Sequence, residues 1–315
     1  MRIEPTKNTV SLEHFNSSTL EKVTRMIEVL EFIYRHPKQK SYLVLKGGTA
    51  LHLIHFPLKR LSVDIDLDFH SPMDKSEIML IRQRIRDNLD QFLISKGYQK
   101  NSRSRFSYGL DALIYQYTNE KGNKDYIKIE INYLHRVHVM KPVWAKVIRN
   151  PIWPEFEVQT LHPIELFATK IVALMNRLAA RDFYDVFQIL ENHKFSDEDG
   201  SHLKSIVLFY VSITSKNYDK SLSPDMLQHL TYHQMKLTLL PMLSKEDNFN
   251  LEQAKKIIDP FIRDVFDLTK DEQAYFDSLK EGRFQPEMLF QSSQIQRDIS
   301  AHPMVLWILK HRPID

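Results

Sequence analysis

The sequence predicts an α+β protein, in which a small α/β domain with a mixed sheet precedes a mostly α-helical C-terminal domain. Apolar and polar residues alternate strictly over 62–69, as in a half-buried strand, and two further strand-like segments form a hairpin around residue 122. Beyond about residue 160 most segments have helical period. Because 315 residues suggest about two domains, we expect an N-terminal helical segment over 1–38, an α/β domain over 39–158 and a helical domain over 159–315.

Helices and strands are expected to follow one another in the first half of the chain. Apolar residues at helical spacing predict helices over 20–34 and 74–96, which end at His36-Pro37 and before Gly97. A short helix over 49–55 stops before Pro57. Strands are expected over the ranges 42–45, 62–69, 106–118, 125–134 and 143–148.

The second half is expected to be helical from Pro163, since proline is favoured at the start of a helix and Glu165 falls in the first turn. Neither an internal repeat nor a low-complexity tract is visible in the sequence. Breaks between helices are expected at Asn192, Gly200, Ser223-Pro224, Pro241, Pro260, Gly282 and Pro286.

Composition excludes several classes of protein. The chain has no cysteine, so disulfides, thiol catalysis and Cys-based zinc sites are excluded, and a reducing cytoplasm is the expected location. No apolar run approaches the roughly 20 residues of a membrane span, and the first residues lack the apolar core of a signal peptide. Residues 96–149 hold eleven Lys and Arg against four acids. This excess suits a polyanionic partner, or it reflects lysines scattered on solvated strands.

The strand over 62–69 carries the strongest chemical signal. Alternation places Asp64, Asp66 and Asp68 on one face, where neighbouring carboxylates repel by about 2.5 kcal/mol at 6 to 7 Å and an effective dielectric of about 20. Bound Mg²⁺ and substrate phosphates would relieve that repulsion. An EF-hand loop is excluded because its sixth position requires glycine and here is Phe69. The remaining alternative is an acidic edge strand that faces solvent.

Only seven glycines occur in the chain, and two of them, Gly47 and Gly48, are adjacent. A strand that leads through two glycines into a helix can aim backbone N–H groups at a phosphate. On its own the pair is equally consistent with a tight turn. About 15 residues separate it from the aspartate strand, so together the two segments predict a site for a nucleotide and its metal ions.

Three segments, taken in order, resemble a known family. Lys46-Gly47-Gly48-Thr49-Ala50-Leu51, followed by Arg60-x-Ser62-x-Asp64-x-Asp66-Leu67-Asp68, resembles the first motif of the AbiEii/AbiGii nucleotidyltransferase toxins, which belong to the DNA polymerase β-like nucleotidyltransferase superfamily. Lys128-Ile129-Glu130 resembles the second motif, and the segment from Thr160 to Asp185 resembles the third. The resemblance covers roughly residues 40–190; the last 120 residues resemble only a helical tail.

The resemblance implies a metal-dependent nucleotidyltransferase that transfers NMP from an NTP with two Mg²⁺ ions, Mn²⁺ being an alternative metal. It implies metal ligation by Asp64 and Asp66, with Glu130 as a third carboxylate. The helical domain would contribute Lys170, which stabilises the triphosphate, and Asp185, which completes the catalytic group. The nucleotide-binding residues implied are Lys46, Gly47, Gly48, Thr49, Arg60, Ser62 and Lys170.

The helical motif has a plainer alternative. Lys170, Arg177, Arg181 and Asp185 are spaced 7, 4 and 4 residues apart, which predicts one helical face. Arg181 and Asp185 would then form an exposed i,i+4 ion pair worth a few tenths of a kcal/mol. Asp182 lies off this stripe and is expected to be a structural partner of a neighbouring cation.

The resemblance also implies an acceptor and a partner. Relatives act as toxins on the 3′ end of tRNA, in phage abortive infection, with a cognate antitoxin protein as partner, and a basic segment suits an RNA acceptor. Ser62 matches a position where phosphorylation switches off some relatives. Two alternatives remain open from the sequence: transfer to a small molecule or a protein hydroxyl, and a non-catalytic regulator that binds nucleotide or RNA.

Overall fold

The structure, a computed structural model, describes residues 2–3, 12–37, 39–56, 59–71, 73–148, 151–215 and 224–311. Residues 1, 4–11 and 38 of the expected N-terminal segment, together with Pro57, Arg149 and Ser223, lie outside these ranges. The chain divides into two compact units. Unit 1 comprises Met1–Arg136, Pro142–Leu161 and Met242–Glu246, and unit 2 comprises Val137–Lys141, His162–Pro241 and Asp247–Asp315. In the described ranges no helix is both long enough and apolar enough to cross a membrane.

Unit 1 is built on a mixed sheet, which confirms the predicted fold class. Its strands are β1 (Arg2–Ile3), β2 (Leu43–Lys46), β3 (Asp64–Phe69), β4 (Gln99–Lys100), β5 (Arg105–Phe106), β6 (Leu110–Thr118), β7 (Lys124–Asn132), β8 (Val143–Lys146) and β9 (Glu157–Thr160). The strand order is β1-β8-β9-β2-β3-β7-β6-β4, and β5 pairs with β6. β3 therefore lies inside the sheet, antiparallel to β2 and parallel to β7.

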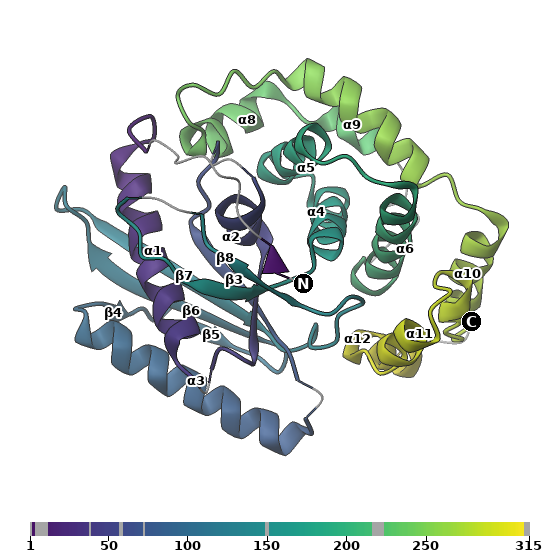
Figure 1. The fold of residues 1–315 in the computed structure, drawn as a ribbon, viewed down its shortest axis with the longest axis horizontal. Helices are drawn as coiled ribbons and strands as arrows, with labels where there is room; N and C mark the ends of the chain where they lie inside the picture. The colour runs from purple at the N-terminus through teal and green to yellow at the C-terminus, as the bar shows by residue number, and fades with distance from the viewer. Residues whose placement is uncertain are drawn as a thin grey trace. The chain divides into compact units, whose positions relative to one another are not determined.

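One face of this sheet is covered by two helices, α1 (Ser17–Arg35) and α3 (Lys75–Ser95), which lie side by side along it in Figure 1. Arg25 of α1 lies over the Tyr117 ring, 4.4 Å from its centroid, and Arg82 of α3 donates two hydrogen bonds to Asp111. Side chains alternate along a strand, so every second residue of β6 and β7 faces these helices and the others face away. The buried apolar residues of the helix-covered face include Leu113, Tyr115, Ile127, Ile129 and Ile131.

A helix follows β2 without a loop. α2 (Gly47–Ala50) continues into η1 (Leu51–His55), a turn of π-helix. The helix begins two residues earlier than predicted because Gly47 adopts a φ of +71°, which lets the chain turn directly out of the strand. Thr49, Ala50 and Leu51 are fully buried, so this short helix is part of the core of unit 1.

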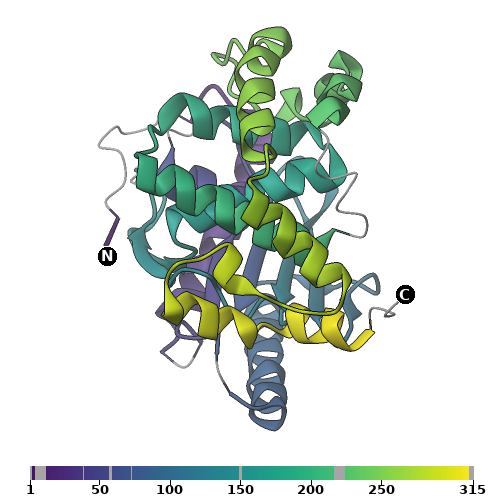
Figure 2. The same cartoon turned by 90° about the vertical axis from the view of Figure 1, so that its right-hand side faces the viewer.

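Unit 2 is helical, as predicted. Its long helices are α4 (Pro163–Arg177), α5 (Ala180–Asn192), α6 (Asp197–Thr214) and α9 (Leu251–Val265). α4 packs against α5 and α6, and the last helix, α12 (Pro303–His311), packs against α6 (Figure 2). The other elements of this part of the chain are η2 (Pro224–His229), α8 (Tyr232–Thr238), η3 (Leu240–Met242), α10 (Lys270–Lys280), η4 (Pro286–Met288) and α11 (Ser293–Ser300).

Glu165, in the first turn of α4, holds the segment Val137–Lys141 in unit 2. Its fully buried carboxylate accepts hydrogen bonds from the backbone N–H groups of Val139 and Met140, at 3.0 and 2.8 Å, and from the Tyr210 hydroxyl at 2.5 Å. Burial raises the pKa of Glu165 although all three donors favour the charged form. Glu165 lies in the first turn of α4, as predicted, and its carboxylate also fixes this segment.

The prediction that Lys170, Arg177, Arg181 and Asp185 share one helical face is wrong. α4 ends at Arg177, Leu178 adopts a left-handed φ of +46°, and α5 begins at Ala180. Spacing along the sequence therefore does not define a face across this break. A leucine rarely takes a left-handed conformation, and the glycine or asparagine that would signal the end of the helix is absent at position 178.

Two of the predicted helix breaks are also wrong. Gly200 lies in the first turn of α6, whose N-cap is Ser196. Pro260 lies inside α9, where it removes one backbone N–H from the helical hydrogen bonds. α9 nevertheless continues, because it buries Ala254, Ile258 and Ile262, and packing of an apolar face contributes more to a helix than local propensity does.

Candidate functional site

Three aspartates of β3 share the face of the sheet that is turned away from α1 and α3. Asp64 and Asp66 are half-buried and Asp68 is buried, whereas Ile65, Leu67 and Phe69 are fully buried on the opposite face. The alternation predicted from the sequence is confirmed. The alternative of an acidic edge strand is wrong, because β3 is hydrogen-bonded on both sides, to β2 and β7.

Charged residues of the neighbouring strands flank these aspartates. In the register of the sheet Asp66 lies between Lys46 of β2 and Glu130 of β7, and Lys128 of β7 lies beside Asp64. The Lys46 Nζ is 2.5 Å from Asp68 Oδ1, and the Lys128 Nζ is 2.7 Å from Glu130 Oε2. Acidic and basic side chains therefore alternate over one small area of the sheet.

The pKa of Lys128 reflects this setting. Burial by itself would lower it, but the hydrogen bond to Glu130 and the charges of Glu130, Asp64 and Asp66 outweigh burial and raise it. Lys128 is thus a firmly held cation beside the β3 carboxylates. The sequence motif contains Lys128 but predicts no role for it; its place on the same alternating face as Glu130 is the signal that could have identified it.

The two adjacent glycines lie directly against the aspartate strand. A Cβ on Gly47 would lie only 2.5 Å from Asp66 Oδ2, and a Cβ on Gly48 would lie 2.6 Å from Arg60 Nη2 and 2.9 Å from Ser62 Oγ. Gly47 also needs its positive φ. The glycine pair therefore serves both as the tight turn and as a close approach of backbone to Asp66, Arg60 and Ser62.

Two further predicted nucleotide-binding residues are buried beside this turn. The Thr49 hydroxyl donates to the backbone carbonyl of Asp64 at 2.5 Å, which ties the start of α2 to the start of β3. Arg60 is 2% exposed, and its Nη1 donates to the Leu61 carbonyl. The chain around Arg60 is fixed by the segment Met242–Glu246, since Leu61 N–H donates to the Met242 carbonyl and Ser244 N–H to that of Lys59. Nothing in the sequence signals this distant segment.

The donor atoms on this face suit a hard divalent cation. Asp64, Asp66 and Glu130 supply only carboxylate oxygens, the ligands that Mg²⁺ prefers. No three His, Cys, Asp or Glu side chains within the described ranges come together as a complete metal-binding group. This still fits Mg²⁺, which commonly takes one or two protein carboxylates and completes its coordination with water and substrate phosphates.

In unit 2, Lys170 and Asp185 form a buried ion pair. The Lys170 Nζ of α4 is 2.8 Å from Asp185 Oδ2 and 3.7 Å from Asp182 Oδ1, both on α5. Asp182 also accepts two hydrogen bonds from Arg177, at 2.5 and 2.9 Å. The prediction that Asp182 is a structural partner of a neighbouring cation is confirmed. The turn at Leu178 brings these residues of two helices together.

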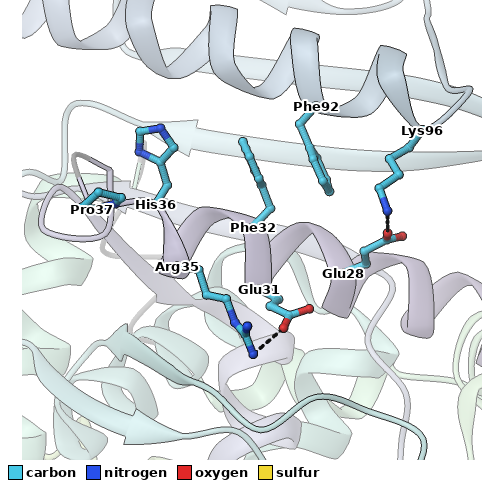
Figure 3. A pocket seen from close by; sticks show the side chains of 8 residues that line it. All are labelled: Glu28, Glu31, Phe32, Arg35, His36, Pro37, Phe92 and Lys96. Carbon is cyan, nitrogen blue, oxygen red and sulfur yellow. Dashed lines mark hydrogen bonds and ion pairs between the residues drawn. The ribbon is translucent and has the colours of Figure 1, made fainter.

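A cavity of about 480 Å³ lies elsewhere in unit 1, between α1 and α3 (Figure 3). The rings of Phe32 and Phe92 stack across it with centroids 4.0 Å apart. The Lys96–Glu28 ion pair, 2.5 Å long, closes one side. All of its lining residues belong to the helices that cover the opposite face of the sheet or to the turn after α1, so this cavity is not part of the carboxylate site.

Comparison with known proteins agrees with this geometry. The fold is similar to that of MenT4, a nucleotidyltransferase toxin from Mycobacterium tuberculosis H37Rv, with a TM-score of 0.55, 16% identity, and coverage of 91% of this chain and 92% of that chain. No curated protein sequence matches the chain. A family model described as nucleotidyl transferase AbiEii toxin of type IV toxin–antitoxin systems matches residues 31–282. The chain belongs to this family and is a nucleotidyltransferase.

Proposed function

We propose that this type IV nucleotidyltransferase toxin transfers NMP from an NTP to the 3′ end of tRNA, in a reaction that depends on Mg²⁺, and that it acts in phage abortive infection. Family membership supplies the reaction class, the NTP substrate and the antitoxin partner. The observation that carries the proposal further is the pair Asp64 and Asp66, half-buried on an inner strand with the Gly47 backbone against Asp66.

Each residue of this face has a proposed task. Asp64 and Asp66 hold the metal, and Glu130, beside Asp66 in the register, adds a third carboxylate. When bound, Mg²⁺ neutralises charge on the triphosphate and lowers the pKa of the attacking hydroxyl. Nucleotidyl transfer depends mainly on positioning and charge neutralisation, which rigid strands and a buried helix supply.

The turn after β2 is the proposed triphosphate site. Gly47 and Gly48 bring the backbone at the start of α2 close to Asp66, Arg60 and Ser62, and Lys46, Arg60 and Ser62 supply polar side chains for the triphosphate. Thr49 acts through its hydrogen bond to Asp64, which fixes the turn relative to the metal ligands. This division of roles is supported by the short distances from the two glycines to Asp66, Arg60 and Ser62.

We propose that Lys170 and Asp185 of unit 2 act in the same reaction, with Lys170 stabilising the triphosphate and Asp185 completing the catalytic group. The family motif supports these roles. The ion pair between them supports them as well, because a buried charged pair contributes little to stability compared with apolar residues of similar volume. A functional role explains why such a pair is present.

One experiment tests the acceptor. The purified protein is incubated with Mg²⁺, each radiolabelled NTP in turn, total RNA and a protein extract, and the label is followed into each fraction. We expect label at the 3′ end of tRNA only, and no transfer when EDTA replaces Mg²⁺. Label in protein or in a small molecule would contradict the RNA acceptor, and transfer in EDTA would contradict metal dependence.

A further inference from the structure

The two faces of the unit 1 sheet differ in how their basic residues are neutralised. On the helix-covered side, five pairs match basic residues of the sheet and of its two helices with acids, although Lys75 and Arg84 of α3 form none with the described acids: Lys22–Asp125, Arg82–Asp111, Arg86–Asp111, Lys96–Glu28 and Lys100–Asp90. On the side that bears Asp64 and Asp66, the exposed residues Arg103, Arg105 and Lys124 form no ion pair with any acid of the described chain. Three cations without an ion pair in the described chain therefore lie on the face that bears Asp64 and Asp66.

The register of the sheet places Arg105 in line with the catalytic carboxylates. Arg105 of β5 pairs with Ala112 of β6, and Ala112 pairs in turn with Glu130 of β7. Glu130 pairs with Asp66 of β3. Residues opposite each other in neighbouring strands point to the same face. Arg105 thus shares the face of Asp66, three strand spacings away, which is about 14 Å.

Lys124 and Tyr126 lie on the same face, along β7. Lys128 is the register partner of Asp64, and side chains two residues apart on a strand point the same way. Tyr126 is therefore about 7 Å along the strand from Lys128, and Lys124 about 7 Å further. Both residues lie between the carboxylates and the hairpin end of the sheet.

Arg103 covers the ring of Tyr126. Its guanidinium carbon is 4.3 Å from the ring centroid, within the range of a cation–π contact. Asn101 Oδ1 accepts hydrogen bonds from the backbone N–H and the Nε of Arg103, at 3.0 and 3.2 Å, and Asn101 N–H donates to the Ile114 carbonyl at 2.8 Å. The stack is thus held in place before any ligand arrives.

We propose that Arg103, Arg105, Lys124 and Tyr126, called here the basic–aromatic strip, bind the single-stranded 3′ end of the acceptor RNA. This inference rests on the proposed RNA acceptor. Unpaired Arg and Lys neutralise phosphates, and a guanidinium stacked on an aromatic ring presents a flat surface for a base regardless of sequence. An acidic protein would use the cations but not the flat Arg103–Tyr126 stack, so the combination favours RNA. The strip lies on the face from which the RNA terminus would reach Asp64 and Asp66.

Fluorescence anisotropy with a short unstructured RNA, labelled at its 5′ end and carrying a free 3′ hydroxyl, tests the strip. Binding by the full-length protein is measured without NTP over a series of salt concentrations. The triple variant Arg103→Ala/Arg105→Ala/Lys124→Ala should reduce the slope of log Kd against log salt by about 2, since each phosphate contact to a single strand contributes about 0.7. Tyr126→Ala should weaken binding roughly tenfold, whereas Tyr126→Phe keeps the ring and should bind like the parent.

The matched control is Lys22→Ala/Lys96→Ala/Lys100→Ala, which removes the same charge from the opposite side of the sheet. It should leave the salt slope unchanged, and thermal melting should show that all variants are folded. Equal slopes of log Kd against log salt for the two triple variants would contradict the proposal that the strip binds RNA. Displacement of the RNA by polyglutamate as readily as by unlabelled RNA would also contradict the proposal. A Tyr126→Ala variant in which only the KM for NTP rises would contradict it as well.

The labelling assay distinguishes a failure of the strip proposal from a failure of the proposed RNA acceptor. Transfer of label to RNA by a strip variant as efficiently as by the parent would overturn the strip and leave the RNA acceptor standing. Failure of the parent protein both to bind RNA and to label it would overturn the acceptor proposal and the strip together.

Discussion

Replacing Gly47 by alanine places one methyl group against the Asp66 carboxylate. The new Cβ would lie 2.5 Å from Asp66 Oδ2 and 3.2 Å from its Cγ, so the carboxylate must move. The φ of +71° adds a backbone cost of about 1–2 kcal/mol for any L side chain. A displacement of about 1 Å at a reacting group can cost about 100-fold in rate.

Gly122 offers a control that separates these two effects. Its φ is +80°, but a Cβ there would meet nothing within 4 Å. Gly122→Ala should therefore carry the same backbone cost as Gly47→Ala without touching the site. Both variants should lower Tm by a few degrees, at roughly 2–4 °C per kcal/mol.

The assay is the initial rate of labelled NMP transfer at saturating NTP, measured beside a thermal melt. We expect Gly47→Ala to lose about 100-fold in rate and Gly122→Ala to keep the rate of the parent. Equal rates for the two variants would refute the reasoning that the Gly47 backbone sets the position of Asp66.

Three further outcomes follow from the contacts described. Lys170→Met should abolish transfer and destabilise the fold by about 3–5 kcal/mol, because it breaks the buried ion pair with Asp185. The double variant Lys170→Met/Asp185→Leu should recover Tm, and recovery of activity as well would show that the pair is only structural. Ser62→Glu should weaken NTP binding roughly 30-fold, from about 2 kcal/mol of repulsion with the triphosphate. Ser62→Ala, which removes only a hydroxyl, should weaken it no more than about tenfold in an NTP titration. His162 caps α4 by accepting a hydrogen bond from Ile164 N–H. Burial lowers the pKa of His162, although the charge of Asp199 opposes this. The neutral imidazole therefore stabilises the fold above about pH 6.5, and this stability is lost as the pH falls below that value. The Tm of His162→Asn, which caps without titrating, should fall less than that of the parent between pH 7.5 and pH 5, and parallel losses would contradict this.

The parts of the site that depend on local sequence could be predicted. Strict alternation is a property of neighbouring residues, so the sequence alone is enough to predict that Asp64 and Asp66 share one face of β3. The glycine pair is also local, and its close approach to Asp66 follows from the turn between β2 and α2.

The parts that depend on long-range pairing could not. The register that sets Glu130 beside Asp66, and the Lys46–Asp68 contact, are fixed by how strands align across the sheet. β9 covers only four residues, too few for a periodic signal, and lies in the sheet because β2 and β8 flank it. The turn at Leu178 depends on a left-handed leucine, a conformation that no residue preference signals.

The central claim is that the β3 carboxylates form the catalytic centre, and Asp66→Asn tests it most directly. Single-turnover transfer of labelled NMP is compared for the parent, Asp66→Asn and the control Asp87→Asn on the exposed surface of α3, where Asp87 accepts a hydrogen bond from Gln83. We predict that Asp66→Asn loses at least about 100-fold in rate with an unchanged Tm, while Asp87→Asn keeps the parent rate. A rate for Asp66→Asn equal to that of Asp87→Asn would contradict the claim.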